Sequence, residues 1–196
     1  MASGTVPVLE TERLRLRQWT AADFEPLADF LGREALNRFR GGALAREQAW
    51  EFLSARAGEW QIRGYGSFVI EEKKSGRPAG YAGLWHPFDL AEPELMWSLY
   101  PEYHGKGYAT EAARAVIDWA DRTLHLGPLM SFIHPDNTPS IAVAERLGAS
   151  IEELTTLRGE TRYRYRHVLP AMPAGQQSIQ STRSTNNQIS SSKGLN

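Results

Sequence analysis

A loop that contains two glycines lies directly before a long amphipathic segment. Apolar side chains recur at helical spacing from Ala109 to Leu124, so the sequence predicts a helix there. The unpaired N–H groups at the start of a helix and the helix dipole favour a bound anion, and glycine lets the backbone come close to it. These features predict a pyrophosphate cradle in the loop. The loop residues are His104, Gly105, Lys106, Gly107, Tyr108, Ala109 and Thr110.

A strand is predicted immediately before this loop, from Glu94 to Tyr100. Leu95, Trp97 and Leu99 fall on one face of it, which is typical of a half-buried strand. Pro101 has no N–H to donate to a neighbouring strand, so we expect the strand to end there.

The remaining segments predict a mixed α/β domain. Six further strands are predicted, over Leu9–Trp19, Tyr65–Glu72, Ala79–Trp85, Leu129–Ile133, Ile151–Leu157 and Thr161–Val168. Further helices are predicted after the Thr20–Asp23 capping box, over Ala45–Ala57 with Trp50 and Leu53 on the apolar side, and from Asn137 or Thr138 to Gly148. This order favours a sheet rich in hairpins over strict β–α–β alternation.

Two segments carry more specific expectations. Leu14 and Leu16 alternate with arginines, so we expect the leucines to be buried and the arginines to be solvated. The segment Asn37–Ala43 has two glycines and two arginines. It is either a loop on the substrate side or a plain connection, and the sequence does not decide between them.

The composition predicts one domain without cysteine chemistry. The chain has 196 residues, a formal net charge of −1 and no cysteine, so disulfides, thiolate nucleophiles and cysteine metal sites are excluded. The near-neutral charge does not favour nucleic acid or an anionic membrane. The N-terminal segment lacks the features of a secretory signal, and no apolar run approaches about 18 residues. We expect a cytoplasmic protein with a domain over 1–173 and a polar, disordered tail over 174–196.

Three motifs together resemble the GCN5-related N-acetyltransferases, and within them the RimJ/RimL-type ribosomal-protein acetyltransferases. The motifs are Glu10–Arg17, Glu94–Ala112 and Asn137–Gly148, and the resemblance extends from Leu9 to Val168. The family's pyrophosphate loop reads (Arg/Gln)-x-x-Gly-x-(Gly/Ala), and this chain departs from it at the first position, with His104. The backbone amides that form the cradle do not depend on that side chain.

The resemblance implies a mostly antiparallel, twisted sheet that splays between its fourth and fifth strands, with acetyl-CoA bound in the gap. Trp97, Ser98 and Leu99 would then offer main-chain contacts to the cofactor, and the amides of Gly105–Thr110 would bind its pyrophosphate. Asn137 is similar to the family residue that hydrogen-bonds the pantetheine arm. Lys106 is either close to a phosphate or a solvated side chain. No metal is implied.

Acetyl transfer to an amine needs a group that accepts a proton, because an alkyl ammonium has a pKa of about 10. Glu94 resembles the family's strand glutamate and is the first candidate, acting through water, with Glu160 and His134 as alternatives. Many relatives carry a tyrosine one residue before Glu145 that protonates the leaving thiolate. Here that residue is Ala144, so Ser140 is the candidate donor to the sulfur.

The resemblance implies direct transfer to a primary amine, either a protein N-terminus or a small molecule. Tyr163, Arg164 and Tyr165 are expected at the border of the acceptor pocket. Monomer and homodimer remain open. The alternative is a non-catalytic module that binds or senses acyl-CoA. A dinucleotide site is disfavoured, because Thr110 stands where the third glycine of that fingerprint belongs and Gly127 where its acid belongs.

Overall fold

The computed structural model describes residues 5–168, so the predicted tail at 174–196 and the predicted domain boundary at 173 lie outside the described residues. An eight-stranded sheet has the order β1-β2-β3-β4-β5-β6-β8-β7. Its strands are β1 (Leu9–Glu10), β2 (Leu14–Arg17), β3 (Ser67–Glu72), β4 (Arg77–Trp85), β5 (Glu94–Leu99), β6 (Leu129–Ile133), β7 (Ser150–Leu157) and β8 (Glu160–His167). The α-helices are α1 (Phe24–Leu31), α2 (Glu34–Asn37), α3 (Arg46–Arg63), α4 (Tyr108–Trp119) and α5 (Thr138–Arg146).

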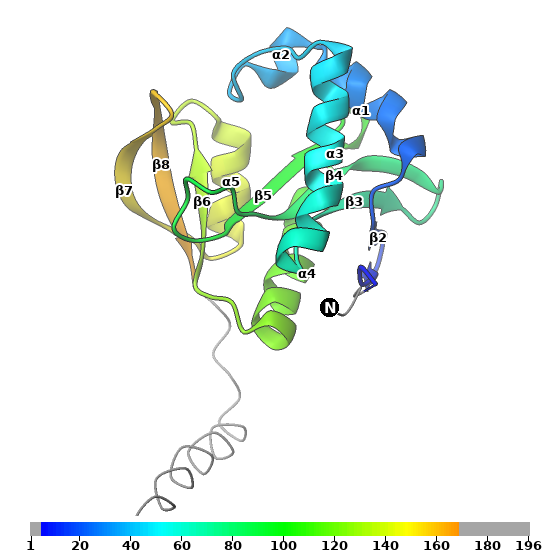
Figure 1. The fold of residues 1–196 in the computed structure, drawn as a ribbon. Coiled ribbons are helices and arrows are strands. Elements are labelled where there is room, and N and C mark those ends of the chain that lie inside the picture. Colours follow the sequence, from blue (N-terminus) through cyan, green and yellow to red (C-terminus); the bar gives the residue numbers. More distant parts are fainter. Residues whose placement is uncertain (1–4, 169–196) are drawn as a thin grey trace, which may run out of the picture.

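The predicted splay of the sheet is confirmed. β5 and β6 run parallel and share one register pair, Glu94 with Met130, in the described part of the chain. The other neighbouring strands of this sheet pair antiparallel over longer registers. The two strands therefore separate beyond Glu94, and backbone groups of β5 are left unpaired on that side. Beside the opening, α5 follows β6 along the chain (Figure 1).

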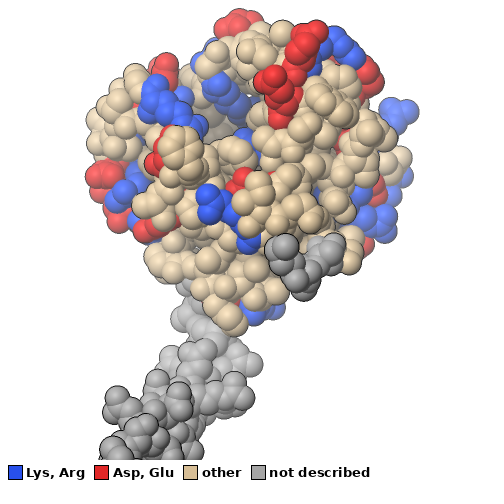
Figure 2. Space-filling view, in the orientation of Figure 1, with Lys and Arg blue, Asp and Glu red and all other residues tan. Residues whose placement is uncertain are grey.

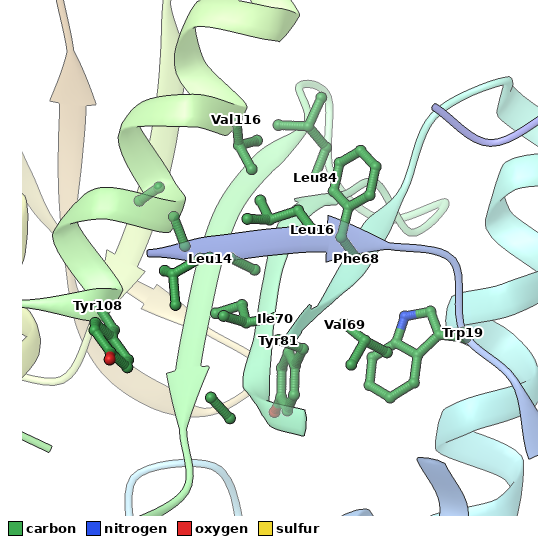
Figure 3. Close-up of a cluster of buried hydrophobic side chains, with 14 of the residues drawn as sticks. Leu14, Leu16, Trp19, Phe68, Val69, Ile70, Tyr81, Leu84, Tyr108 and Val116 are labelled. Carbon is green, nitrogen blue, oxygen red and sulfur yellow. The ribbon is translucent and has the colours of Figure 1, made fainter. Parts of the chain in front are cut away.

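The prediction of one strand over Leu9–Trp19 is wrong. Two strands form instead, because the side chain of Thr11 accepts a hydrogen bond from the amide of Leu14 at 3.0 Å and turns the chain back. As a result, the strands predicted as fourth and fifth are β5 and β6. Leu14 and Leu16 are fully buried, as expected. Figure 3 shows them close to Phe68, Ile70, Leu84 and Val116.

The arginines of this segment are paired with acids rather than simply solvated. Arg17 donates to Asp23 at 2.8 Å and to Glu71 at 2.7 Å. Arg13 pairs with Glu111 at 2.5 Å. The alternation of apolar and charged residues predicts which face of the strand each side chain occupies. It does not predict the ion pairs of the arginines, because most of the paired acids come from other segments of the chain.

Helices cover both faces of the sheet (Figure 1). Tyr81 of β4 packs on Phe52 of α3 with ring centroids 5.5 Å apart, and Phe68 of β3 packs on Trp119 of α4 at 5.4 Å. Tyr81 lies directly opposite Val69, the neighbour of Phe68, so the two rings point to opposite faces. Thus α3 covers one face of the sheet and α4 covers the other.

The helix α3 differs from the prediction over Ala45–Ala57. It continues to Arg63, and Trp50 is 47% exposed, in a T-shaped contact with Phe24. The buried residues of this helix are Ala49, Leu53, Arg56, Glu59 and Trp60. The buried stripe includes charged residues, which is why hydrophobic spacing alone assigned the wrong face to Trp50.

Candidate active site

The glycine loop forms the start of α4 through two left-handed residues. Gly105 has φ +74° and Gly107, the N-cap residue, has φ +78°. The first helical hydrogen bond runs from the Glu111 amide to the Gly107 carbonyl at 3.1 Å. The amides of Tyr108, Ala109 and Thr110 precede that bond and have no acceptor within the helix. They are the donors that an anionic group requires at a helix start.

Two side chains hold the loop in place. The Nε2 of His104 donates to the Leu99 carbonyl at 3.0 Å, which ties the loop to the end of β5. Arg13 donates to the Lys106 carbonyl at 2.9 Å. The ammonium of Lys106 lies 4.8 Å from the ring centroid of Tyr103 and 3.8 Å from Glu72. The Lys106 side chain therefore points away from the cradle, and only its amide remains as a candidate ligand.

A cavity of about 1060 Å³ runs from the splay to this loop. Its lining brings together all of the predicted cofactor residues except Lys106: Trp97, Ser98, Leu99, His104, Gly105, Gly107, Tyr108, Ala109, Thr110, Asn137 and Ser140. We call it the cofactor groove.

Five arginines also line the cofactor groove: Arg13, Arg38, Arg40, Arg114 and Arg146. Arg114 donates to the carbonyl of Arg146 at 3.2 Å, which links α4 to the end of α5. Guanidinium groups match the geometry of phosphate oxygens, so the groove suits a ligand with several phosphates.

A second cavity, of about 460 Å³, lies on the other side of the splay. We call it the acceptor cavity. Trp97, Asn137 and Ser140 line both cavities, so the two meet at the start of α5 and the middle of β5. Phe39 and Arg40 also line both, so the segment Asn37–Ala43 borders the two cavities.

The acceptor cavity contains all three candidate bases, Glu94, His134 and Glu160. Glu94 lies opposite Trp85 across β4 and β5, so both side chains lie on the face covered by α3. Its Oε1 accepts a hydrogen bond from the Phe132 amide at 3.3 Å. Burial raises the pKa of Glu94, and the Phe132 amide and the positive charge of Arg56 counteract this only in part. A carboxylate with a raised pKa is a better proton acceptor near neutral pH.

The two alternative bases have ordinary structural roles. His134 stacks on Phe39 with ring centroids 4.9 Å apart, and its Nδ1 accepts from the Asp136 amide at 3.1 Å. Glu160 is 59% exposed and lies 3.7 Å from Arg162. Glu94 lies at the opening of the sheet and burial raises its pKa, so it remains the strongest candidate.

The start of α5 is organised by Asn137. Its Oδ1 accepts from the Ser140 amide at 3.4 Å, which caps the helix and leaves its amide NH2 group for other partners. The hydroxyl-bearing Ser140 lies at the junction of the two cavities. Ala144, one turn further along, is fully buried beside Ile133 and offers no hydroxyl.

Tyr163, Arg164 and Tyr165, which were expected at the border of the acceptor pocket, do not line the acceptor cavity. Tyr165 belongs to a buried cluster with Ile133, and Arg164 pairs with Glu152 at 3.0 Å. Four arginines line this cavity: Arg40, Arg56, Arg158 and Arg162. Of these, sequence reasoning raised only Arg40, as part of the segment Asn37–Ala43, and missed the other three. Basic side chains gather beside the hollow between α2 and the β7–β8 hairpin (Figure 2).

Within residues 5–168, no group of three or more His, Cys, Asp or Glu side chains could hold a metal ion. In the same part of the chain, no helix is both long and apolar enough to cross a membrane.

Residues 13–150 match the family model described as an acetyltransferase (GNAT) domain. The structure is similar to a solved acetyltransferase from Agrobacterium tumefaciens str. C58, with a TM-score of 0.77 and 35% identity, covering 86% of this chain and 98% of that chain. The spermidine N(1)-acetyltransferase of Escherichia coli (strain K12) is 38% identical over 88 residues, which cover 43% of this chain and 45% of that protein.

A RimL ribosomal L7/L12 alpha-N-protein acetyltransferase, solved in complex with coenzyme A, has the same fold. Its TM-score is 0.67 at 17% identity, covering 82% of this chain and 96% of that chain. The chain therefore belongs to the GNAT family of acetyltransferases. The resemblance to the GCN5-related N-acetyltransferases that was inferred from the three sequence motifs is confirmed, and a RimL-type structure shares the fold.

Proposed function

We propose that this protein transfers the acetyl group of acetyl-CoA to a primary amine by direct attack in a ternary complex. The observation that carries the proposal is the meeting of two cavities at Trp97, Asn137 and Ser140, with Glu94 on one side and the free amides of the α4 start on the other. A long cofactor and a separate acceptor can then reach one reaction point from opposite directions.

In the proposed reaction, the amine nitrogen attacks the thioester carbonyl carbon and the C–S bond breaks. Glu94 accepts the proton of the ammonium, directly or through water, because its raised pKa suits that step. The nitrogen then gives up its second proton to water and the thiolate of CoA takes one up from water, while the Ser140 hydroxyl stabilises the sulfur by donating a hydrogen bond to it. The unpaired backbone of β5 beside the splay supports the thioester oxygen and the pantetheine arm.

In this proposal, CoA binds through the amides of Gly105–Thr110, the backbone of Trp97, Ser98 and Leu99, and the Asn137 side chain. The His104 side chain positions the loop rather than contacting phosphate, because its Nε2 already donates to Leu99. No metal takes part.

The direct test is CoA release from acetyl-CoA with a panel of amines. The panel contains N-terminal peptides, which RimL suggests, polyamines, which the spermidine acetyltransferase suggests, and amino acids. We expect turnover with at least one class and none without an amine.

A second candidate function is a non-catalytic module that binds acyl-CoA. Ala144 favours it, since the position that carries the thiolate acid in many relatives has no hydroxyl here. Tight binding of acetyl-CoA without CoA release on any amine would support this alternative and contradict the enzyme.

A further inference from the structure

An arginine reaches into the acceptor cavity from the core side of α3. Arg56 is 9% exposed and lies on the buried stripe of the helix, between Leu53 and Trp60. Its guanidinium carbon is 3.5 Å from the ring centroid of Trp85 and 4.5 Å from that of Phe52. A guanidinium that stacks on an aromatic ring keeps its N–H groups at its edge, in the plane, where they can bind another group.

Two of those donors are unused. The Nε and Nη1 atoms of Arg56 are buried and have no hydrogen-bond partner within residues 5–168. Burying a charged donor without an acceptor costs free energy, so such a group marks a place where a ligand completes the structure. Burial lowers the pKa of Arg56 to about 10, which leaves it positively charged at neutral pH.

The neighbouring charges do not neutralise Arg56. Arg158 forms two hydrogen bonds of 2.9 Å to Asp89. Arg162 lies 3.7 Å from Glu160 and donates to the Phe39 carbonyl at 3.1 Å. On α3 itself, Glu59 pairs with Arg63 at 3.1 Å. The acids near the cavity are thus engaged by other arginines, with the exception of Glu94.

Glu94 offsets one positive charge of the cavity while it is ionised, and its carboxylate accepts from the Phe132 amide. Four arginines line the cavity, however, against two acids, Glu94 and Glu160. Arg40 adds a second guanidinium, which lies 6.0 Å from the ring centroid of Tyr81 and 3.5 Å from the Asn37 oxygen. The acceptor cavity therefore keeps an excess of positive charge beside the proposed base.

We propose that Arg56, assisted by Arg40, binds a carboxylate of the acetyl acceptor, so that the acceptor is an amine that also carries a carboxylate. This inference rests on the proposed function and specifies its substrate class. A carboxylate satisfies the free N–H groups of Arg56 through charge-assisted hydrogen bonds. A polyamine would instead bring further positive charges next to the arginines of the cavity, and their repulsion disfavours it.

The first experiment measures kcat/KM for CoA release with acceptors matched in everything but one carboxylate. One arm compares free aspartate, free glutamate and small amino acids with the amides of the same compounds. Spermidine is included as an acceptor that carries several positive charges and no carboxylate. The other arm compares Ser-Asp with Ser-Asn peptide amides. In one arm, we expect kcat/KM to be at least about tenfold higher for the acceptor with the carboxylate than for its amide. The arm that shows this difference tells whether the carboxylate belongs to a free amino acid or to an acidic peptide. Equal rates within every pair, or a preference for spermidine, overturn the inference.

The second experiment repeats the comparison in Arg56→Gln, with Arg46→Gln as the matched control. Arg46 lies on the same helix, is well exposed and pairs with Glu25 at 2.7 Å. In Arg56→Gln we expect the KM of the carboxylate acceptor to rise about tenfold or more, while the KM of its amide and the Kd of acetyl-CoA stay the same. Each acceptor is compared between the variant and the wild-type protein, so the intrinsic reactivity of its amine does not affect the ratio of the two KM values. An equal loss on both acceptors contradicts the inference.

A binding measurement separates this inference from the proposed function. N-acetyl amino acids and their amides are titrated into the CoA-bound protein by calorimetry, which needs no turnover. A preference for the carboxylate without CoA release on any amine supports the inference and contradicts the enzyme. CoA release without a preference for the carboxylate supports the enzyme and contradicts the inference. If Arg56→Gln does not fold, Arg40→Gln in the loop after α2 must reduce the preference instead, and an unchanged preference there overturns the role of the arginine pair.

Discussion

Glu94 and Met130 form the single register pair between β5 and β6 in the described sheet, and the two strands separate from that point. The candidate base is therefore the residue at which the sheet opens. Its amide and carbonyl belong to a paired strand, its side chain reaches the acceptor cavity, and the strand that it begins continues into the cofactor groove. One residue thus connects the splay with the proposed proton transfer.

Replacing Glu94 by Gln removes the proposed base without changing the size of the side chain. We expect kcat to fall by about 100-fold, since general base catalysis typically contributes 10²–10⁴-fold. The Kd of acetyl-CoA should not change, because Glu94 lines only the acceptor cavity. Initial rates and calorimetry measure the two quantities. Glu51→Gln, on the exposed side of α3, is the control. If the rate of Glu94→Gln stays at the wild-type value, the base is another group.

Gly107→Val should weaken acetyl-CoA binding by about tenfold or more, because a β-branched side chain blocks close approach of the pyrophosphate and disfavours positive φ. Gly76→Val is the matched control, since Gly76 has φ +66° in the turn between β3 and β4, away from both cavities. Both variants should lose about 1–3 kcal/mol of folding stability from backbone strain. Only Gly107→Val should change the Kd measured by calorimetry. Equal affinities of the two variants would contradict the cradle.

Ser140→Ala tests the proposed donor to the sulfur. We expect kcat to fall by roughly tenfold, at the low end of what a positioned proton donor contributes, with little change in the Kd of acetyl-CoA. Thr138→Ala, at an exposed position of the same helix turn, should leave kcat as it is. Pre-steady-state rates of CoA release give the comparison. A wild-type rate in Ser140→Ala would mean that water or a backbone N–H stabilises the thiolate without the serine hydroxyl.

His167 should make the protein less stable in acid. Ser131 donates to the Leu95 carbonyl at 2.6 Å, so its oxygen accepts from the Nε2 of His167 at 2.8 Å. The Nδ1 of His167 is buried without a partner within residues 5–168, so a proton added there would have no acceptor. Burial lowers the pKa of His167 to about 4. The unfolded chain therefore takes up a proton near its ordinary pKa of 6.5, before the folded protein does, and stability falls as the pH drops from about 6.5 to about 4.

The loss from this one residue should reach up to about 3 kcal/mol. Urea unfolding at pH 7 and at pH 4.5 measures it. His167→Gln has no group that titrates in this range, so its stability should fall less between the two pH values, although it starts from a lower stability at pH 7. Parallel pH profiles of the two proteins would rule out His167 as the cause.

Local patterns in the sequence were sufficient for much of the fold. The strand Leu129–Ile133 and the helix start at Asn137 follow from an apolar run and a cap, and both are observed. The loop with Gly105 and Gly107 also follows from local chemistry, because a left-handed backbone at a helix start depends on the residues at those positions. These features were predictable since each involves residues that are close along the chain.

Only the tertiary structure decided what surrounds the reaction point. The sequence did not predict that Arg56 is buried, because the apolar face of its helix was placed at Trp50, which is exposed. The aromatic ring that Arg56 stacks on, Trp85, belongs to β4 rather than to the same helix. Arg158 and Asp89 neutralise each other across a long stretch of chain, while Arg56 keeps free donors. The charge of the acceptor cavity is the sum of such long-range pairings. The sequence by itself determined the family and the glycine loop before α4, and the packing of α3 on β4 and β5 decided which charges line the acceptor cavity.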